Sequence, residues 1–411
     1  MDNFYKLFLI PAALLLLVGC DTNNLNVGEP NEYLVSDSFV REITADQLTA
    51  FWQFIGVPEV QDFLDYDVRV YRIVYNTIDG NGNPIEASGA ILVPNGIDNP
   101  GLLSVQHATI FSNDEAPSVD RNNPIQGIVS STTRKAIFAS AGYITFLPDY
   151  IGYGITNNQL HPYQQEQTLA TASRDMVLAG LEFVAENDLA DINQPVDMIG
   201  YSEGAYATLA LAKLIENGPP IINIGQITMG APIFDLTGTM DYIINNIDDQ
   251  FECVSCYAYF LYTYHQIYDL PRPLGDYFNE PYASIIEDGL FSGENTSAFV
   301  RNQLPENLVE LFTEEFIDRY LNNQEPELLA AVGENDIFYI PQAPVLLVHG
   351  DADGVAPIFN SDDFEARAMN QGKTNFTYIR PQGVTHGGGF VPWGLETMQL
   401  LTGQGKLLVK N

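Results

Sequence analysis

Basic residues are scarce in this sequence. Its 411 residues include 17 Lys and Arg against 53 Asp and Glu, which gives a formal net charge of −36 at pH 7. A surface this acidic repels nucleic acid and disfavours phosphate-binding sites, so nucleic acid is excluded as a partner. Anionic substrates are unfavourable for the same reason. A neutral small molecule fits this charge better.

Cysteines are also few, and no pattern of residues suggests a metal site. Of the 3 cysteines, Cys253 and Cys256 form a single C-x-x-C, with no histidine pair near it in the sequence. A zinc site needs more ligands than this stretch supplies. Because the N-terminus indicates export, we expect a local disulfide between Cys253 and Cys256, with a redox role as the alternative.

Long apolar runs are absent beyond the N-terminus. There, an apolar stretch over residues 7–18 is too short for a comfortable membrane span and is typical of a signal peptide. The ending Leu17-Val18-Gly19-Cys20 resembles the lipobox of bacterial lipoproteins, in which the cysteine becomes the lipidated first residue. We therefore expect residues 1–19 to be a signal peptide, Cys20 to be a membrane anchor, and residues 20–35 to be a flexible tether. This predicts a lipoprotein of the bacterial cell envelope, on the outer membrane or cell surface, with ordinary secretion as the alternative.

The rest of the chain has the pattern of one large α/β domain with an insertion. A short helix is expected over residues 44–56, and two extended runs at 70–75 and 87–93 flank Asp79-Gly80-Asn81-Gly82, whose turn chemistry predicts a hairpin. Apolar strands then alternate with helical stretches, which favours a mostly parallel sheet with right-handed crossovers. These strands are predicted at 101–105, 143–148, 196–199, 224–229, 345–348 and 376–379.

The alternation stops between residues 233 and 340. This segment is rich in aromatic residues, and we expect it to form a helical cap on a core made of residues 36–232 and 341–411. Most of its aromatic side chains are expected in the core of the cap, and the others in an apolar wall over a site. Four of its apolar residues recur at helical spacing and predict one amphipathic helix: Leu308, Phe312, Phe316 and Tyr320.

One stretch has the signature of a nucleophile. Gly200-Tyr201-Ser202-Glu203-Gly204 is a G-x-S-x-G between a predicted strand and a predicted helix. A serine on such a sharp turn adopts strained backbone geometry, and the two glycines leave room for the neighbouring strand and helix. The backbone N–H of Glu203, at the helix start, would point to a developing oxyanion. The motif predicts acyl transfer at Ser202, with a solvated serine in a Gly-rich turn as the alternative.

A serine nucleophile needs a base, and the base needs a carboxylate that orients it. His386 lies in a loop after the last predicted strand, where the chain order Ser, Asp, His requires the base. The acid should follow the preceding strand, where the spacing G-x-x-D-x-V-x-P favours Asp353. Asp351 is the alternative acid, but we expect it to shape the turn through local backbone hydrogen bonds. We therefore predict a Ser202, His386 and Asp353 triad.

The second oxyanion donor should come from the loop after the strand at 101–105. We assign it to the backbone N–H of Thr109 or, failing that, of Ala108. His107, just before them, is expected to be structural and not a second base.

Together these segments resemble the α/β-hydrolase superfamily, and within it the secretory-lipase and carboxylesterase-like branch. The hairpin at 71–94, the run Pro148-Asp149-Tyr150-Ile151-Gly152-Tyr153-Gly154 and the run His161-Pro162-Tyr163 add to the similarity. The resemblance implies an α/β-hydrolase fold with a lid over an ester pocket, the triad named above, and no cofactor. The chain differs in having Ala108 between His and Thr where glycine is usual, and Ala205 where a second glycine is usual.

We therefore expect a serine hydrolase that cleaves carboxylic esters through an acyl-enzyme, with a small neutral ester or a lipid as substrate. Two alternatives remain. Acyl chemistry does not by itself select esters over amides, so a serine peptidase of the same fold is one. A surface binding protein that keeps the fold without turnover is the other.

Overall fold

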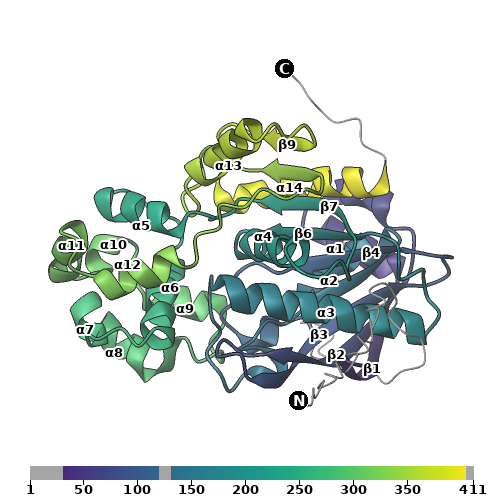
Figure 1. Cartoon of the computed structure of the whole chain (residues 1–411), viewed down its shortest axis with the longest axis horizontal. Helices are drawn as coiled ribbons and strands as arrows, with labels where there is room; N and C mark the ends of the chain where they lie inside the picture. The colour runs from purple at the N-terminus through teal and green to yellow at the C-terminus, as the bar shows by residue number, and fades with distance from the viewer. Residues whose placement is uncertain (1–30, 120–130, 404–411) are drawn as a thin grey trace, which may run out of the picture.

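A nine-stranded mixed sheet forms the centre of the molecule (Figure 1). The computed structural model describes residues 31–119 and 131–403. The strand order is β1-β2-β3-β5-β4-β6-β7-β8-β9. The strands are β1 (Leu34–Ile43), β2 (Val68–Ile78), β3 (Pro84–Pro94), β4 (Gly101–Gln106), β5 (Tyr143–Pro148), β6 (Val196–Tyr201), β7 (Ile224–Gly230), β8 (Val345–Val348) and β9 (Phe376–Ile379).

The strand pairing follows the sequence pattern. From β1 to β5 the neighbours are antiparallel, and β2 and β3 form the expected hairpin. From β5 through β9 every neighbouring pair is parallel. The mostly parallel sheet is therefore confirmed, and its carboxyl ends meet at one edge, where ligands bind in open sheets of this kind.

Helices cover both faces of the sheet. One face packs against α3, α4 and α13, and the other against α1, α2, α14 and a short 3₁₀ helix, η1. The helices of the core are α1 (Ala45–Phe54), η1 (Pro58–Phe63), η2 (Asn113–Glu115), α2 (Ser131–Ser140), η3 (Gly154–Thr156), α3 (Glu166–Glu186), α4 (Glu203–Glu216), α13 (Phe359–Asn370) and α14 (His386–Thr402).

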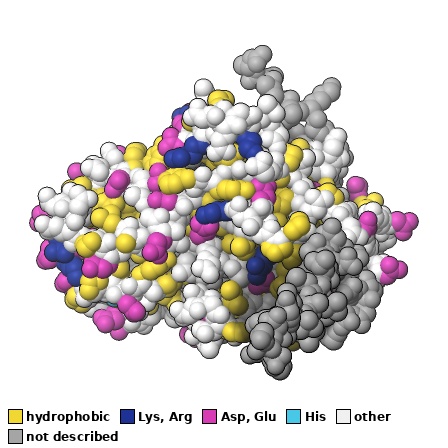
Figure 2. Space-filling view, viewed as in Figure 1, with side chains coloured by type: hydrophobic (Ala, Val, Ile, Leu, Met, Phe, Trp, Pro, Cys, Tyr) yellow, Lys and Arg dark blue, Asp and Glu magenta, His cyan; other side chains and the backbone are white. Residues whose placement is uncertain are grey.

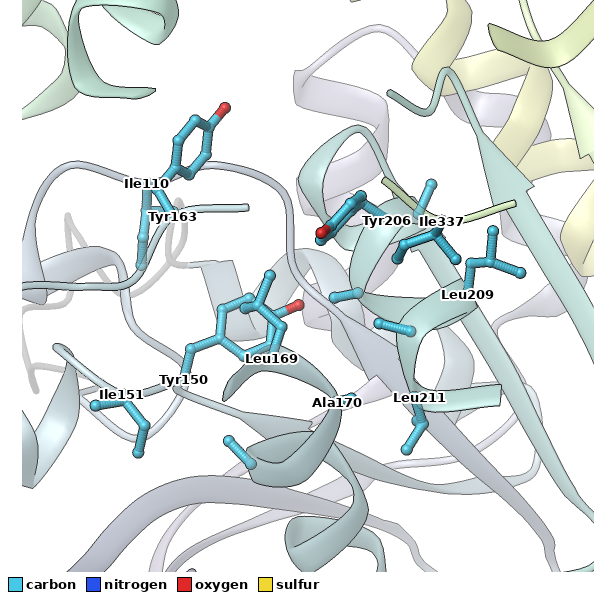
Figure 3. Close-up of a cluster of buried hydrophobic side chains, with 14 of the residues drawn as sticks. Ile110, Tyr150, Ile151, Tyr163, Leu169, Ala170, Tyr206, Leu209, Leu211 and Ile337 are labelled. Carbon is cyan, nitrogen blue, oxygen red and sulfur yellow. The ribbon is translucent and has the colours of Figure 1, made fainter. Parts of the chain in front are cut away.

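The larger of the two cores lies under α3 and α4. Figure 3 shows part of it, where Leu169 and Ala170 of α3 and Tyr206 and Leu209 of α4 come together with Tyr150. This cluster also runs into the cap, so the cap and the sheet share one apolar interior. Burying each such side chain stabilises the fold by about 1.5–3 kcal/mol before the loss of chain entropy is counted.

The sequence interpretation missed strand β1. We predicted a tether up to residue 35, whereas the strand begins at Leu34 and pairs with β2 at the edge of the sheet. The buried Glu182 of α3 accepts backbone N–H bonds from Glu32, Tyr33 and Leu34. The chain is therefore fixed to the core from Glu32 onward.

The inserted segment between β7 and β8 is helical, as expected, and its helices lie together on one side of the molecule (Figure 1). Its helices are α5 (Leu236–Asn245), α6 (Val254–Ile267), α7 (Leu274–Tyr277), α8 (Tyr282–Ile285), η4 (Ile286–Leu290, a π-helix), α9 (Ser297–Gln303), α10 (Leu308–Leu311), α11 (Glu314–Leu321) and α12 (Pro326–Gly333). Its aromatic residues are largely buried among themselves, and Cys253 and Cys256 are joined by a disulfide at the start of α6.

The single amphipathic helix predicted over residues 308–320 is wrong. The chain forms two short helices, α10 and α11, separated at Phe312 and Thr313. Thr313 accepts the N–H of Phe316 at 3.0 Å and so caps α11, while its hydroxyl donates to the carbonyl of Asp276. These bonds end one helix and begin the next, because a capping threonine favours a helix start over a helix interior.

Acidic side chains are scattered over the visible surface among fewer basic ones (Figure 2). Within residues 31–119 and 131–403, no helix combines the length and the apolar character needed to cross a bilayer. The predicted signal peptide and Cys20 lie outside the described residues. The division into a core and a cap at residues 233 and 340 stays a prediction.

Candidate active site

The site is built on the turn between β6 and α4. Ser202 stands between them with φ 58° and ψ −122°, a strained conformation for a residue with a side chain. A Cβ at Gly200 would lie 2.0 Å from the carbonyl oxygen of Gly204, and one at Gly204 would lie 2.2 Å from that of Gln106. The two glycines therefore let β6, α4 and the end of β4 approach closely, and this places Ser202 at the carboxyl edge of the sheet.

The structure brings together the three residues that the sequence singled out. The hydroxyl oxygen of Ser202 is 3.0 Å from Nε2 of His386, and Nδ1 of His386 is 2.7 Å from Oδ2 of Asp353. A carboxylate only accepts hydrogen bonds, so Nδ1 carries the proton and Nε2 is free to accept one from the serine. The side chain of His386 is 15% exposed and that of Asp353 is 1% exposed. The triad is therefore partly exposed to solvent at His386 and fully buried at Asp353.

Asp353 is held by more partners than its triad role requires. Its Oδ1 accepts the backbone N–H groups of Val355 and Ala356 at 2.8 and 2.7 Å. Its Oδ2 also lies 3.2 Å from Nε2 of His349. Burial by itself raises the pKa of Asp353, but the hydrogen bonds from His349 and His386 outweigh it and hold the pKa well below its usual range. The carboxylate therefore stays ionised beside His386.

Asp351, the alternative acid, does not reach His386. It is exposed, and its Oδ1 accepts the N–H of Gly383 at 2.6 Å. This bond fixes the loop that leads to His386, which is the turn-shaping role expected of it. The contact of His349 with Asp353 was not anticipated, because its place at the end of a strand carries no signal of its partner.

The loop after β4 runs beside the serine turn, since the backbone of Gln106 touches Gly204. His107 follows it and is buried, with Nδ1 2.8 Å from the carbonyl of Ala108 and Nε2 3.1 Å from that of Asp149. Burial lowers the pKa of His107 to about 3, which favours a neutral, structural ring that donates one of these two hydrogen bonds. Whether Ala108 or Thr109 presents its N–H to an oxyanion stays a prediction.

A second buried histidine touches the residue after the nucleophile. Oε1 of Glu203 lies 2.7 Å from Nε2 of His161, and both side chains are 2% exposed or less. The sequence interpretation gave Glu203 only a backbone role. The run His161-Pro162-Tyr163 was the signal available, but nothing in it names Glu203 as the partner.

A cavity of about 620 Å³ lies on the α1 and α14 side of the sheet, next to the loop after β4. We call it the α1–α14 cavity. Its walls include the loop from His107 to Ile110, and also Tyr201 and Phe390. Tyr201 precedes the nucleophile and donates a hydrogen bond to the carbonyl of His386 at 2.5 Å, so this wall adjoins the triad. Much of the rest is apolar: Trp52, Val60, Ile137, Phe138, Trp393 and Met398.

Charged groups also line the cavity, and the cap contributes little to its wall. Arg134, Lys135, Asp114 and Glu115 line it, and of the described cap residues Thr296 alone contributes to its wall. Burial, reinforced by the nearby Arg134, lowers the pKa of Lys135 to about 7. Across residues 31–119 and 131–403, the cavity included, no three His, Cys, Asp or Glu side chains are grouped so that they could hold a metal ion.

Comparison with known proteins identifies related sequences and folds. A model of the secretory lipase family matches residues 136–388. A probable trichothecene esterase of the fungus Stachybotrys chartarum is 27% identical over 187 residues, which are 42% of this chain and 36% of that relative. The chain therefore spans little more than a third of the length of this relative.

Three solved structures share the fold. A protein of Legionella pneumophila superposes with a TM-score of 0.80 at 23% identity, covering 92% of this chain and all of the other. The rice cell wall degrading esterase LipA of Xanthomonas oryzae gives 0.76 at 20% identity, covering 91% and 97%. Lipase A of Candida antarctica gives 0.65 at 14% identity, covering 92% and 84%. These likenesses confirm the expected α/β-hydrolase fold with a helical cap.

Proposed function

Because the chain belongs to the secretory lipase family, we propose that it is a serine hydrolase that cleaves carboxylic esters. One observation carries the proposal. Asp353, His386 and Ser202 form a continuous chain of hydrogen bonds, 2.7 Å and 3.0 Å long, that ends on a serine in a strained turn. The similarity to a trichothecene esterase supports an ester over an amide as the bond cleaved.

The geometry supports a two-step acyl transfer. The hydroxyl oxygen of Ser202 attacks the ester carbonyl carbon as Nε2 of His386 takes its proton, and the N–H groups of Glu203 and Thr109 bind the oxyanion. His386 then gives the proton to the departing alcohol, which leaves an ester on Ser202. A water molecule, deprotonated by His386, attacks this ester, releases the carboxylic acid and restores the serine. Asp353 orients the imidazole and stabilises its charged form throughout.

We assign the acyl side of the substrate to the α1–α14 cavity. Its wall contains Thr109, Tyr201 and Phe390, which adjoin the proposed oxyanion site and the triad, and its interior is mostly apolar. Its volume of about 620 Å³ lies in the range of sites for small molecules. The substrate class that fits is a neutral ester with an extended apolar acyl chain, in contrast to an acetyl ester.

Hydrolysis of a p-nitrophenyl ester series from acetate to palmitate tests the proposal. The unlipidated chain, residues 21–411, should cleave the longer esters fastest, and Ser202→Ala should abolish turnover without unfolding the protein. Ser173→Ala is the control, because this buried hydroxyl lies on α3 and has no hydrogen-bond partner in the described structure. A fluorophosphonate probe should label Ser202. Ester hydrolysis that persists in Ser202→Ala, or an unlabelled Ser202, contradicts the assignment.

We further propose that the protein works outside the cytoplasm on a lipid anchor. The lipobox-like end at Cys20, the membership in a secretory family and the disulfide between Cys253 and Cys256 support this. Labelled fatty acid should be incorporated into the chain in its bacterial host and should be lost in Cys20→Ala. Secretion of an unlabelled protein would instead favour an ordinary secreted enzyme.

A further inference from the structure

The number of protons held by His161 and Glu203 can be worked out from their neighbours. Nδ1 of His161 lies 2.8 Å from the carbonyl oxygen of Ile151, and Nε2 lies 2.7 Å from Oε1 of Glu203. A carbonyl only accepts, so Nδ1 carries a hydrogen. The contact at Nε2 then needs a second proton, either on the imidazole or on the carboxyl group. Both arrangements have the same number of protons and no net charge.

The position of Glu203 makes this neutrality important. Glu203 is the first residue of α4, and its backbone N–H is the proposed oxyanion donor. Five bonds separate this nitrogen from its own carboxyl oxygens, so covalent geometry keeps them within about 6 Å of each other. An uncompensated carboxylate there would repel the negative charge that forms in the reaction, and Coulomb's law makes this worth roughly 10- to 100-fold in rate.

The surroundings of His161 are suited to hold a shared proton. The ring of Tyr150 is stacked on it with centroids 5.8 Å apart, and that of Tyr153 lies at 4.8 Å. These rings enclose the imidazole and fix its plane. Gly152 allows the approach, since its φ is +96° and a Cβ there would lie 2.4 Å from Cα of His161. A tight glycine turn and two tyrosine rings thus hold the imidazole of His161 in place.

We propose that His161 is a positioning residue that shares one proton with Glu203 and so keeps the oxyanion-binding end of α4 free of net charge. The inference rests on the proposed function, because it concerns the oxyanion of ester hydrolysis. It assigns His161 no contact with substrate. It also explains why a buried carboxylate is compatible with an oxyanion donor on the same residue.

Three variants of residues 21–411 test the proposal by their kcat and KM on one p-nitrophenyl ester. His161→Leu leaves the Glu203 carboxylate without its partner, so kcat should fall roughly 10- to 100-fold while KM changes less than about twofold. Glu203→Gln should reduce kcat much less, because the amide is neutral and donates to Nε2 of His161. Adding Glu203→Gln to His161→Leu removes the charge and should restore most of the lost kcat. His265→Leu is the control, since this cap histidine contacts the carbonyl of Arg272 and lies outside the site.

The double variant distinguishes an effect of the Glu203 charge from an effect of side-chain packing. If it is as slow as His161→Leu, or if Glu203→Gln alone is equally slow, the ring acts through packing and the proposal is overturned. Ser202→Ala is measured in parallel. If the parent chain shows no Ser202-dependent turnover, the proposed function has failed. The pairing of His161 with Glu203 is then tested by thermal unfolding. A Tm that falls in His161→Leu and recovers in the double variant supports the neutral pair, and a Tm that does not recover refutes it.

Discussion

Filling the α1–α14 cavity should change which acyl chains the protein prefers. Gly394 lies in α14 and lines this cavity, and an added Cβ there meets no heavy atom of the described residues within 4 Å. Gly394→Leu therefore adds an apolar side chain without a clash at its base. Leucine also favours a helix over glycine by about 0.8 kcal/mol, so the fold should be retained.

The expected magnitude follows from the space that is lost. A leucine side chain takes the room of about three methylenes of an acyl chain, and at about 0.8 kcal/mol per buried methylene a long ester loses about 2.4 kcal/mol. This corresponds to a decrease in kcat/KM of about 60-fold for a long-chain ester. An acetyl ester does not extend into the cavity, so its kcat/KM should change less than about twofold.

Rates on p-nitrophenyl acetate, octanoate and palmitate, compared with those of the parent chain, measure this shift. The matched control is Gly275→Leu in α7, an exposed helical glycine outside the cavity with equal room for a side chain. It should leave the chain-length preference unchanged. If Gly394→Leu lowers kcat/KM for acetate and palmitate by the same factor, or leaves both unchanged, the acyl chain does not occupy this cavity.

Three further predictions concern the triad. Asp353→Asn should lower kcat on the order of 10⁴-fold, because the imidazole of His386 loses the partner that sets its tautomer. The pKa of Asp353 lies below the ordinary value of 3.8, so its contribution to stability is present above that value and is lost as the pH falls toward the folded pKa. The Tm advantage of the parent chain over Asp353→Asn should therefore shrink on acidification below about pH 4, and a constant advantage would contradict this. Ser202→Gly should be more stable than Ser202→Ala by about 1 kcal/mol in chemical unfolding, because glycine relieves the strain at φ 58°, and equal stabilities would refute that strain.

The strands with continuous apolar or aromatic runs were predictable from the sequence, and the largely exposed strand β1 was not. Strands β8 and β9 begin and end where the sequence placed them, at residues 345–348 and 376–379, because their apolar runs stand out between helical stretches. Strand β1 is an edge strand whose side chains are mostly exposed and half of them polar. Its pairing with β2 also shifts register twice, between Leu34 and Ser36 and between Phe39 and Arg41. These irregularities remove the alternation by which a half-buried strand is recognised.

The site shows a similar division. The residues Ser202, Asp353 and His386 could be proposed from the sequence because each is tied to a local pattern and to a fixed chain order. The contact of His161 with Glu203 joins residues 42 positions apart, and it depends on how the loop after β5 packs on α4. The α1–α14 cavity likewise has walls from α1, α2 and α14, which meet only in the folded chain. Side-chain partners and cavities of this kind follow from tertiary packing, for which the local pattern holds no signal.

The cap leaves the sheet after β7 and returns to it before β8, and these two strands are neighbours. The N–H of Ile337 donates to the carbonyl of Phe234 at 2.9 Å. This bond joins the two stems of the inserted segment, at Phe234 and Ile337, where they meet the core. The two ends of the segment are therefore held next to each other, independently of how many residues lie between them. Exchange of everything between these stems for the corresponding segment of another protein would replace the inserted helices while leaving the sheet in register. The inserted segment can therefore be exchanged as one unit, and chimeras joined at Phe234 and Ile337 would carry a different inserted segment on the same sheet.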